Sequence, residues 1–286
     1  MSTLNSKQYK EAERQSWNSV AAGWQKWWKP IERGAEKVSR RLIELAKIKP
    51  GSKVLDIATG IGEPAITAAN LVGSSGHVLA TDISPQMLSI ARQRATSFGL
   101  QDVIEFIEGD IETIVLPPSA FDAALCRFGL MFLPDLKTGL SNIYMSLVEG
   151  GLFAAAVWAS PDQDGLMAKT MSTVMKETNT EQPPPGTPGP FSLSDENTLK
   201  NSFMISGFKD IAIEMMHVSF DFDSPDKFTT FTSETAGPLQ KMLANQTHER
   251  KEEILKAITE VAKEYADKNT GIVKFENEAM LIVGKK

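Results

Sequence analysis

The stretch VLDIATGIGEP at residues 54–64 decides the fold. An apolar run ends in Asp56, two glycines follow with one residue between them, and Glu63 and Pro64 close the stretch. Because glycine lacks a Cβ atom, the backbone of such a turn can take positive φ angles and approach a ligand closely. A helix that starts after the turn offers free N–H groups and a partial positive charge. The stretch therefore predicts a buried strand, a ligand-binding turn and a helix.

Outward from this turn, strand and helix patterns alternate along the chain. Short apolar or alternating runs predict strands at 53–58, 77–82, 103–110, 121–129, 152–159, 208–222 and 272–284. Amphipathic patterns and cap residues predict helices at 6–28, 33–47, 64–73, 84–99, 136–150, 161–177, 195–206 and over most of 225–267. We expect Pro30 to end the first helix and the Pro/Gly-rich segment 180–192 to form an extended linker or lid. Strands that alternate with helices are typical of α/β folds with a parallel sheet.

Size, charge and cysteine content limit the possible partners. The chain has 286 residues, 42% of them hydrophobic, and a net charge of −6, which argues against a nucleic-acid partner. No apolar stretch reaches the roughly 20 residues that span a bilayer, and residues 1–16 lack the apolar run of a secretory signal. The single cysteine, Cys126, excludes an intramolecular disulfide and a cysteine-based zinc cluster. We expect a cytoplasmic monomer or homodimer without stable membrane insertion and without a metal site.

The glycines of the turn are compatible with a dinucleotide cofactor. Gly60, Gly62 and Ala65 match the pattern G-x-G-x-x-G/A. Asp82, at the end of the next strand, lies where an acid binds ribose hydroxyls in such sites. A single match of this kind has low specificity. An NAD-dependent oxidoreductase is therefore one hypothesis.

Three other acids favour a ligand that has no phosphate. Asp56 precedes the turn and Glu63 opens the helix, so both would repel a pyrophosphate and attract an ammonium group. Asp110 ends the third predicted strand, where a carboxylate can accept a hydrogen bond from an exocyclic amine. A ribose, an adenine and an ammonium group without phosphate describe S-adenosylmethionine.

With these motifs the sequence resembles the class I S-adenosylmethionine-dependent methyltransferases over residues 50–160. The family motif of an acid followed by x-G-x-G-x-G is matched from Asp56 to Gly62, with Ala58 in place of the first glycine. The stretches VLDIATGIGEPA and TDISPQMLSIARQRA are most similar to the ubiquinone/menaquinone-biosynthesis C-methyltransferase branch. The resemblance implies a Rossmann-like, seven-stranded, mostly parallel sheet with helices on both faces and an antiparallel last strand.

The resemblance also implies how the chain is divided and where the cofactor binds. We expect an N-terminal helical lid (1–48), a cofactor-binding core (49–160), and a part that holds the cap helices and the last two strands (161–286), all within one structural domain. The cofactor, released as S-adenosylhomocysteine, is assigned to Asp56, Ala58, Thr59, Gly60, Gly62, Glu63, Asp82, Ile83, Met87, Gly109, Asp110, Ile111, Cys126, Arg127 and Phe128.

For the methyl acceptor, the sequence predicts a small apolar or aromatic molecule similar to a quinol or phenol. The segment after the fourth strand, CRFG, lacks the (D/N)-P-P-(Y/F) motif of enzymes that methylate base amines. Candidates for the acceptor pocket are Trp24, Trp27, Trp28, Met131, Phe132 and Trp158. Arg127 and His217 are candidates for a catalytic role, and Met204, Met215 and Met216 are expected in the core. A cofactor-binding regulator without turnover is the non-enzymatic alternative.

Overall fold

The computed structural model describes residues 6–160, 165–181, 184 and 186–286. One sheet contains β1 (Lys53–Ile57), β2 (His77–Asp82), β3 (Ile104–Glu108), β4 (Phe121–Arg127), β5 (Leu147–Trp158), β6 (Lys209–Phe222) and β7 (Val273–Lys285). The α-helices are α1 (Ser6–Lys26), α2 (Trp28–Leu45), α3 (Ala65–Val72), α4 (Pro85–Ser97), α5 (Leu136–Ser146), α6 (Leu166–Thr178), α7 (Glu196–Ile205), α8 (Pro225–Thr235), α9 (Gly237–Leu243) and α10 (His248–Glu264).

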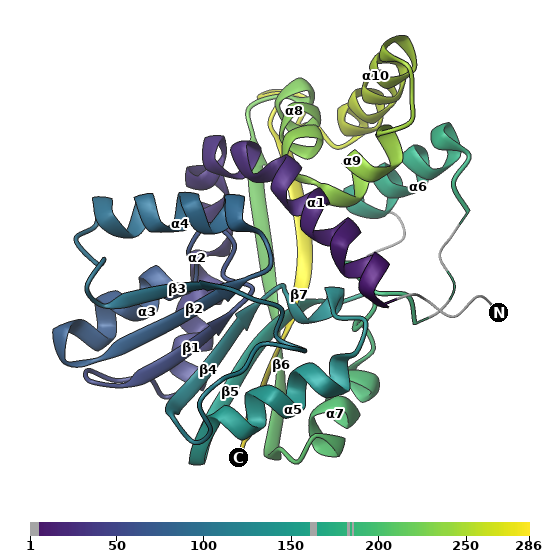
Figure 1. Cartoon of the computed structure of the whole chain (residues 1–286). Helices are drawn as coiled ribbons and strands as arrows, with labels where there is room; N and C mark the ends of the chain where they lie inside the picture. The colour runs from purple at the N-terminus through teal and green to yellow at the C-terminus, as the bar shows by residue number, and fades with distance from the viewer. Residues whose placement is uncertain (1–5, 161–164, 182–183, 185) are drawn as a thin grey trace.

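The seven strands follow the order β3-β2-β1-β4-β5-β7-β6 (Figure 1). Strands β1 to β5 are parallel, and β7 is antiparallel to both of its neighbours. The prediction of a mostly parallel sheet with an antiparallel last strand is confirmed. Because the chain crosses from β3 to β4, strands β1 and β4 flank the point where the strand order reverses. In open α/β sheets, ligands bind at the carboxyl ends of the strands beside this point.

Local sequence explains why these elements form. Strand β1 is buried at every position after Lys53, as expected for a central strand that is covered on both faces. Helix α4 begins at a cap in which the Ser84 hydroxyl accepts a hydrogen bond from the N–H of Met87 at 3.1 Å, and Pro85 occupies its first turn. These caps and buried runs place the strand ends, and therefore the site, with little help from distant residues.

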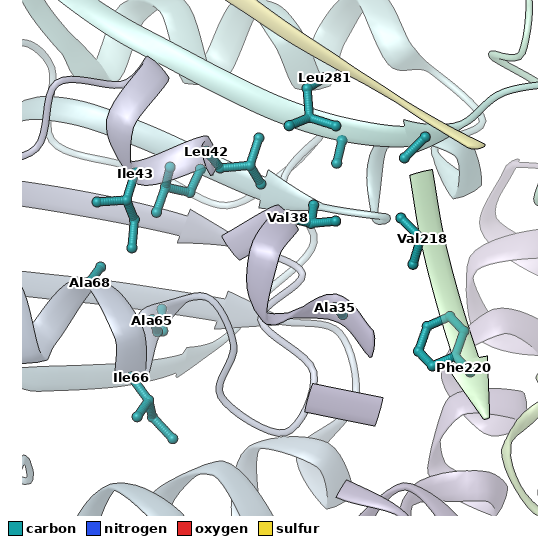
Figure 2. Packing of buried hydrophobic residues seen from close by; sticks show 14 of the residues in the cluster. Ala35, Val38, Leu42, Ile43, Ala65, Ile66, Ala68, Val218, Phe220 and Leu281 are labelled. Atoms are coloured by element: carbon teal, nitrogen blue, oxygen red, sulfur yellow. The ribbon is translucent and has the colours of Figure 1, made fainter. Parts of the chain in front are cut away.

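Helices cover both faces of the sheet (Figure 1). Helices α2, α3 and α4 pack on one face, where Val38 and Leu42 of α2 belong to the same buried cluster as Val218 and Leu281 of the sheet (Figure 2). Helices α5 and α7 pack on the other face. Each fully buried leucine of these clusters stabilises the fold by about 1.5–3 kcal/mol. The two cores fix the sheet on which the site is built.

Strands β6 and β7 extend beyond the carboxyl edge of the sheet into a cap (Figure 1). The cap consists of α6, α8, α9 and α10, and α1 crosses the same edge in contact with α4, α8 and α9. A side chain at Gly23 would place its Cβ 1.9 Å from the carbonyl oxygen of Glu234, so glycine is required where α1 meets α8. Among the described residues, no helix is both long and apolar enough to cross a membrane.

Two predicted helix ends are wrong. Helix α1 already ends at Lys26, and Pro30 lies in the first turn of α2. A proline is tolerated there because its missing N–H has no helical acceptor to lose. Helix α5 ends at Ser146 instead of Gly150, because residues 147–150 already belong to β5 and pair with the sheet through Leu147.

The predicted core positions of two methionines are also wrong. Met204 and Met215 are 58% and 51% exposed, because they lie on the outer sides of α7 and of the edge strand β6. Residues 161–164 of the predicted helix 161–177 lie outside the described residues, and so do residues 182, 183 and 185 of the predicted linker.

Candidate cofactor and acceptor site

A cavity of about 380 Å³ lies at the carboxyl ends of β1 to β4. Helix α1 lines one of its sides, and α6, α8 and α9 line the region below the cap. We call the part beside the strand ends the cofactor end and the part lined by the cap helices, β6 and β7 the acceptor end.

The backbone of the turn after β1 has the conformation that allows a ligand to approach it closely. Gly60 and Gly62 have φ angles of +55° and +105°, in the region that favours glycine. Ala58 has a φ of +55° as well, so the residue that replaces the family glycine keeps its left-handed conformation. The Thr59 carbonyl oxygen accepts hydrogen bonds from the N–H groups of Gly62 and Glu63 at 2.9 and 3.1 Å, which holds the turn closed.

Two buried polar atoms at this turn lack hydrogen-bond partners among the described residues. The Asp56 carboxylate accepts from the N–H of Ala65 through Oδ2 at 3.0 Å, but its Oδ1 has no donor. Burial raises the pKa of Asp56 to about 7. The Oγ1 atom of Thr59, which lines the cavity, is likewise without a partner. The Thr59 hydroxyl lies near enough to the Asp56 carboxylate to oppose the rise of its pKa, so the two groups form one polar site. A buried carboxylate with a hydroxyl beside it fits a ligand that carries a cationic donor group.

The Asp82 carboxylate is prepared to accept further hydrogen bonds. Its two oxygens accept from the N–H groups of Gly60 and Ser84, each at 2.8 Å. Burial raises the pKa of Asp82 to about 6, and these two bonds oppose that shift. Each oxygen keeps a second acceptor position, and the residue lines the cavity. This arrangement fits the vicinal hydroxyls of a ribose.

Helix α1 is attached to the loop after β3 by an ion pair. The Lys10 ammonium group lies 2.6 Å from Oδ2 of Asp110 and 2.5 Å from Oε2 of Glu112. Burial lowers the pKa of Lys10, but the two carboxylates outweigh it, so the net shift is upward. One turn further along α1, Arg14 lies 2.7 Å from Glu108. The first helix thus closes directly over the acid predicted to face the adenine.

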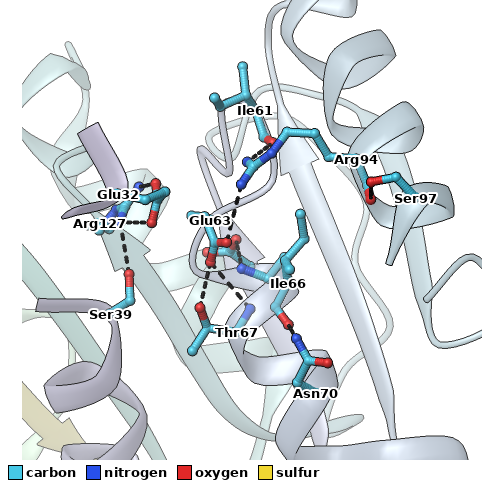
Figure 3. A network of polar contacts seen from close by, with 12 residues as sticks. Glu32, Ser39, Ile61, Glu63, Ile66, Thr67, Asn70, Arg94, Ser97 and Arg127 are labelled. Atoms are coloured by element: carbon cyan, nitrogen blue, oxygen red, sulfur yellow. Dashed lines mark hydrogen bonds and ion pairs between the residues drawn. The ribbon is translucent and has the colours of Figure 1, made fainter. Parts of the chain in front are cut away.

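A buried charge network surrounds the start of α3 (Figure 3). Arg127, with a side chain only 6% exposed, contacts the Glu32 carboxylate at 2.9 Å and the Ser39 hydroxyl at 2.8 Å. Glu63 accepts from the Thr67 hydroxyl at 2.7 Å and lies 3.5 Å from Arg94. Burial raises the pKa of Glu63, helped by the nearby Glu32 carboxylate. Arg127 and Glu63 both line the cavity, so the network connects α2 to the cofactor end.

The acceptor end is apolar. The rings of Phe128 and Trp158 stack with centroids 4.0 Å apart, and Phe128 has a φ of +61°. Further walls are Met167, Met171, Val174, Phe220, Phe228, Phe231, Leu239, Met242 and Phe275. Among the described residues, α6, α8, α9, β6 and β7 contribute no charged side chain to the cavity lining.

The structure brings most of the predicted site residues together at this cavity. Its lining includes Ala58, Thr59, Gly60, Glu63, Asp82, Ile83, Met87, Gly109, Asp110, Ile111, Arg127 and Phe128 from the cofactor prediction. It also includes Trp24, Met131, Phe132 and Trp158 from the acceptor prediction. Asp56, Gly62 and Cys126 lie behind the lining, in the layer that supports it.

Three predicted residues lie away from the cavity lining. The indole N–H of Trp27 donates to Glu234 at 2.5 Å, and Trp28 lies under the Arg94 guanidinium at 4.9 Å, so both attach α1 and α2 to the body. His217 of β6 lies beside Glu276 of β7, its side chain is 59% exposed, and it is not part of the cavity lining.

Sequence reasoning missed the side of α1 that lines the cavity. Tyr9, Glu13 and Trp17 lie there with Trp24. Their spacing of four, four and seven residues is helical and was a usable signal. The cap walls had no comparable signal, because their residues come together only through long-range packing.

The comparisons with known proteins agree with this geometry. A model of the ubiE/COQ5 methyltransferase family matches residues 10–172, more than half of the chain. The chain belongs to this family. The resemblance to class I methyltransferases near that branch is thereby confirmed, together with the expected S-adenosylmethionine dependence at the level of the family. The match contains the whole cofactor end and stops within α6.

Individual relatives cover less of the molecule. The ubiquinone/menaquinone biosynthesis C-methyltransferase UbiE of Ectopseudomonas mendocina is 31% identical over 157 residues, which are 54% of this chain and 61% of that protein. The chain thus aligns with less than two thirds of the length of this relative.

Solved structures show the same fold at low identity. Phosphoethanolamine N-methyltransferase 2 of Haemonchus contortus, in complex with S-adenosyl-L-methionine, has a TM-score of 0.53 and 18% identity, over 86% of this chain and 51% of that one. The [4+2]-cyclase SpnF has a TM-score of 0.55 and 18% identity, over 88% and 82%. Because a cyclase shares the fold, the fold alone does not decide the reaction.

Proposed function

We propose that this ubiE/COQ5 family member transfers a methyl group from S-adenosylmethionine to a small apolar acceptor that carries an aromatic or quinol-like ring. One observation carries this proposal. A single cavity joins an end lined by buried acids and glycines to an end whose cap walls contain no charge. A bisubstrate reaction between a cationic cofactor and an uncharged acceptor needs both environments in contact.

In this proposal each part of the cofactor has its own residues. Asp82 binds the ribose hydroxyls, and Asp110 with Ile111 receives the adenine. Thr59, which lines the cavity, receives the ammonium group, and the buried Asp56 carboxylate behind it attracts this group through its charge. The cofactor, when bound, supplies the reactive methyl group on its sulfonium. The glycine turn lets the backbone approach the ligand.

The chain's own contribution is alignment and exclusion of water. The stacked Phe128 and Trp158 form part of the cavity wall. Positioning of two reactants and removal of water lower a displacement barrier by several kcal/mol. Arg127 is fully engaged with Glu32 and Ser39 and remains charged, so its proposed role is to position the turn and not to accept a proton.

Helix α1 acts in this proposal as a lid over the cofactor end. It contributes Tyr9, Lys10, Glu13, Trp17 and Trp24 to the lining. The Lys10 ion pairs and the hydrogen bond from the Trp24 indole to the carbonyl oxygen of Thr235 at 2.9 Å hold it at both ends. A cytoplasmic setting is part of the same proposal, since the lone cysteine is a free, buried thiol.

The quinol-like acceptor is supported by the name of the bacterial relative and by the apolar walls. The family match ends at residue 172, before α8 and α9, so these walls lie outside the matched region. A regulator without turnover is the competing function, because the fold alone does not decide whether a reaction takes place. An NAD-dependent oxidoreductase is disfavoured by Asp56 and Glu63, which lie where a pyrophosphate would bind.

Calorimetric titration with S-adenosylhomocysteine and, separately, with NAD tests the cofactor. We expect micromolar binding of the first and none of the second. Transfer of labelled methyl from S-adenosylmethionine to menadiol, 2-naphthol and phosphoethanolamine then tests the acceptor, with product on the ring compounds expected. Cofactor binding without product on any ring compound would favour the regulator, and NAD binding would overturn the proposal.

A further inference from the structure

Four threonines of the cap are buried, and one of them differs from the rest. Thr229 and Thr259 share a hydrogen bond of 2.8 Å, and the Thr235 hydroxyl donates to the carbonyl oxygen of Phe231 at 2.7 Å. The Oγ1 atom of Thr170 is buried and has no hydrogen-bond partner within the described residues. Buried hydroxyls are normally paired, so an unpaired one in a cavity wall indicates a ligand group.

The position of Thr170 on α6 supports this interpretation. Met167, Thr170, Met171 and Val174 follow the helical spacing and together form the side of α6 that lines the cavity. Thr170 is therefore the polar point in the middle of an apolar strip. Only 6% of the residue is exposed.

Thr170 also lacks the bond that a helical threonine usually makes. A threonine inside a helix commonly donates to the carbonyl oxygen four residues earlier. The hydroxyl of Thr178, at the end of α6, donates to the carbonyl oxygen of Val174 at 2.8 Å. The hydroxyl of Thr230 in α8 donates in the same way to Asp226 at 2.8 Å. No such bond joins Thr170 to Leu166 in the described structure. The hydroxyl is thus free to serve a group inside the cavity.

We propose that the Thr170 hydroxyl binds an oxygen atom of the acceptor and thereby selects oxygen-bearing rings over plain hydrocarbons. This inference rests on the proposed function, because it assigns the acceptor to this end of the cavity. A hydroxyl can donate to a ring carbonyl or to a phenol oxygen and can accept from a phenol. Met167 and Met171 on either side offer flexible apolar contact to the ring itself. The acceptor class is a neutral aromatic with at least one ring oxygen.

Binding of two matched probes tests the assignment. 2-Naphthol and 2-methylnaphthalene have similar shapes, and only the first carries an oxygen. Their dissociation constants are measured by quenching of tryptophan fluorescence, in the presence of S-adenosylhomocysteine, for wild type, Thr170→Val and Thr170→Ser. We expect wild type to prefer 2-naphthol by about tenfold, which equals the worth of one well-formed hydrogen bond. Thr170→Val is expected to abolish this preference, and Thr170→Ser to keep it.

Controls separate this result from general effects. Thr178→Val changes the same helix outside the lining, and we expect it to leave the preference unchanged. Thr170→Val is expected to melt at a temperature no lower than wild type, because it removes an unpaired buried hydroxyl. A wild type without preference for 2-naphthol, or a Thr170→Val variant that keeps it, overturns the assignment.

The same experiment distinguishes this inference from the proposed function. Binding of S-adenosylhomocysteine alone tests the cofactor assignment and does not involve Thr170. If the preference depends on Thr170 but no methyl transfer occurs, the binding assignment stands and the enzymatic proposal fails. If methyl transfer occurs and the preference for 2-naphthol is the same in all variants, the enzymatic proposal stands and the assignment of Thr170 fails.

Discussion

The two ends of the cavity are built on opposite principles. The cofactor end takes short segments from successive strand ends and contains three buried carboxylates with raised pKa values, those of Asp56, Glu63 and Asp82. The acceptor end takes its walls from α6, α8 and α9 and consists of methionines, aromatic rings and hydroxyls. A buried charge is costly unless a partner is present, so the cofactor end accepts only a ligand whose charges and hydrogen-bond donors match its acids. Apolar walls select a ligand mainly by its shape, so the acceptor end tolerates substitutions more easily.

The largest expected effect comes from breaking the charge network of the cofactor end. Arg127→Met leaves the buried Glu63 and the partly buried Glu32 with one cation fewer. We expect a loss of about 3–5 kcal/mol in the free energy of unfolding, because an unpaired buried charge remains. Chemical denaturation measures it. Arg40→Met, which removes an exposed pair with Glu36, is the control and should cost at most about 0.5 kcal/mol.

Equal losses in both variants would show that the network is not buried in solution. Buried charge would then no longer distinguish the cofactor end from the acceptor end.

A second test neutralises the buried acid behind the turn. The Asp56 carboxyl has a folded pKa of about 7 against 3.8 in the unfolded chain. Such a group costs the folded state nothing below about pH 4, and the cost grows until the pH passes 7. Asp56→Asn should therefore stabilise the free protein by about 2–3 kcal/mol at pH 8 and by less at pH 5. Denaturation at both pH values measures the difference.

The same variant tests the proposed role of this acid in binding. We expect Asp56→Asn to weaken S-adenosylhomocysteine, which has the ammonium group, and to leave 5′-methylthioadenosine, which lacks it, unchanged. A gain in stability that is independent of pH would contradict the raised pKa. Equal effects on both ligands would contradict the ammonium assignment.

The third test removes the ribose acid. Asp82→Ala should weaken S-adenosylhomocysteine binding by about 1–3 kcal/mol, because a hydrogen bond to the ligand is lost and two N–H donors are left unpaired. Titration calorimetry measures the dissociation constant. Met242→Leu, at the acceptor end, is the matched control and should leave this constant unchanged. An unchanged constant in Asp82→Ala would remove Asp82 from the site.

The smallest effect concerns the attachment of α1. Lys10→Met removes the ion pairs to Asp110 and Glu112, and we expect α1 to open more often, by about 1 kcal/mol. Hydrogen exchange of residues 6–26 should accelerate correspondingly and should slow again with S-adenosylhomocysteine bound. Lys7→Met, at an exposed position of the same helix, should not change the exchange. If the exchange rates of residues 6–26 are the same with and without S-adenosylhomocysteine in every variant, α1 is not a lid.

The cofactor end was largely predictable from sequence because its determinants are local. The turn at 54–64, the cap at Ser84 and the acids at strand ends each place a side chain relative to its own strand, and a parallel sheet brings those ends together. Even the substitution at Ala58 was visible, although its left-handed conformation was not.

The acceptor end was only partly predictable because its determinants are long-range. Trp24 was found, but Trp27 and Trp28 lie beyond the end of α1 at Lys26, where the helical phase changes. Sequence periodicity could not show this break, since it placed the helix end at Pro30. Thr170 had no signal in sequence, because its unpaired hydroxyl becomes visible only once its neighbours are in place.

The route of the chain through the cap has an evolutionary consequence. Helix α6 belongs to the connection between β5 and β6, and α8, α9 and α10 belong to the connection between β6 and β7. Both connections leave the sheet and return to it without contributing an acid or a glycine to the proposed cofactor contacts. Mutation, duplication or exchange of these two connections can therefore produce new acceptor preferences during evolution, while the proposed cofactor contacts stay unchanged.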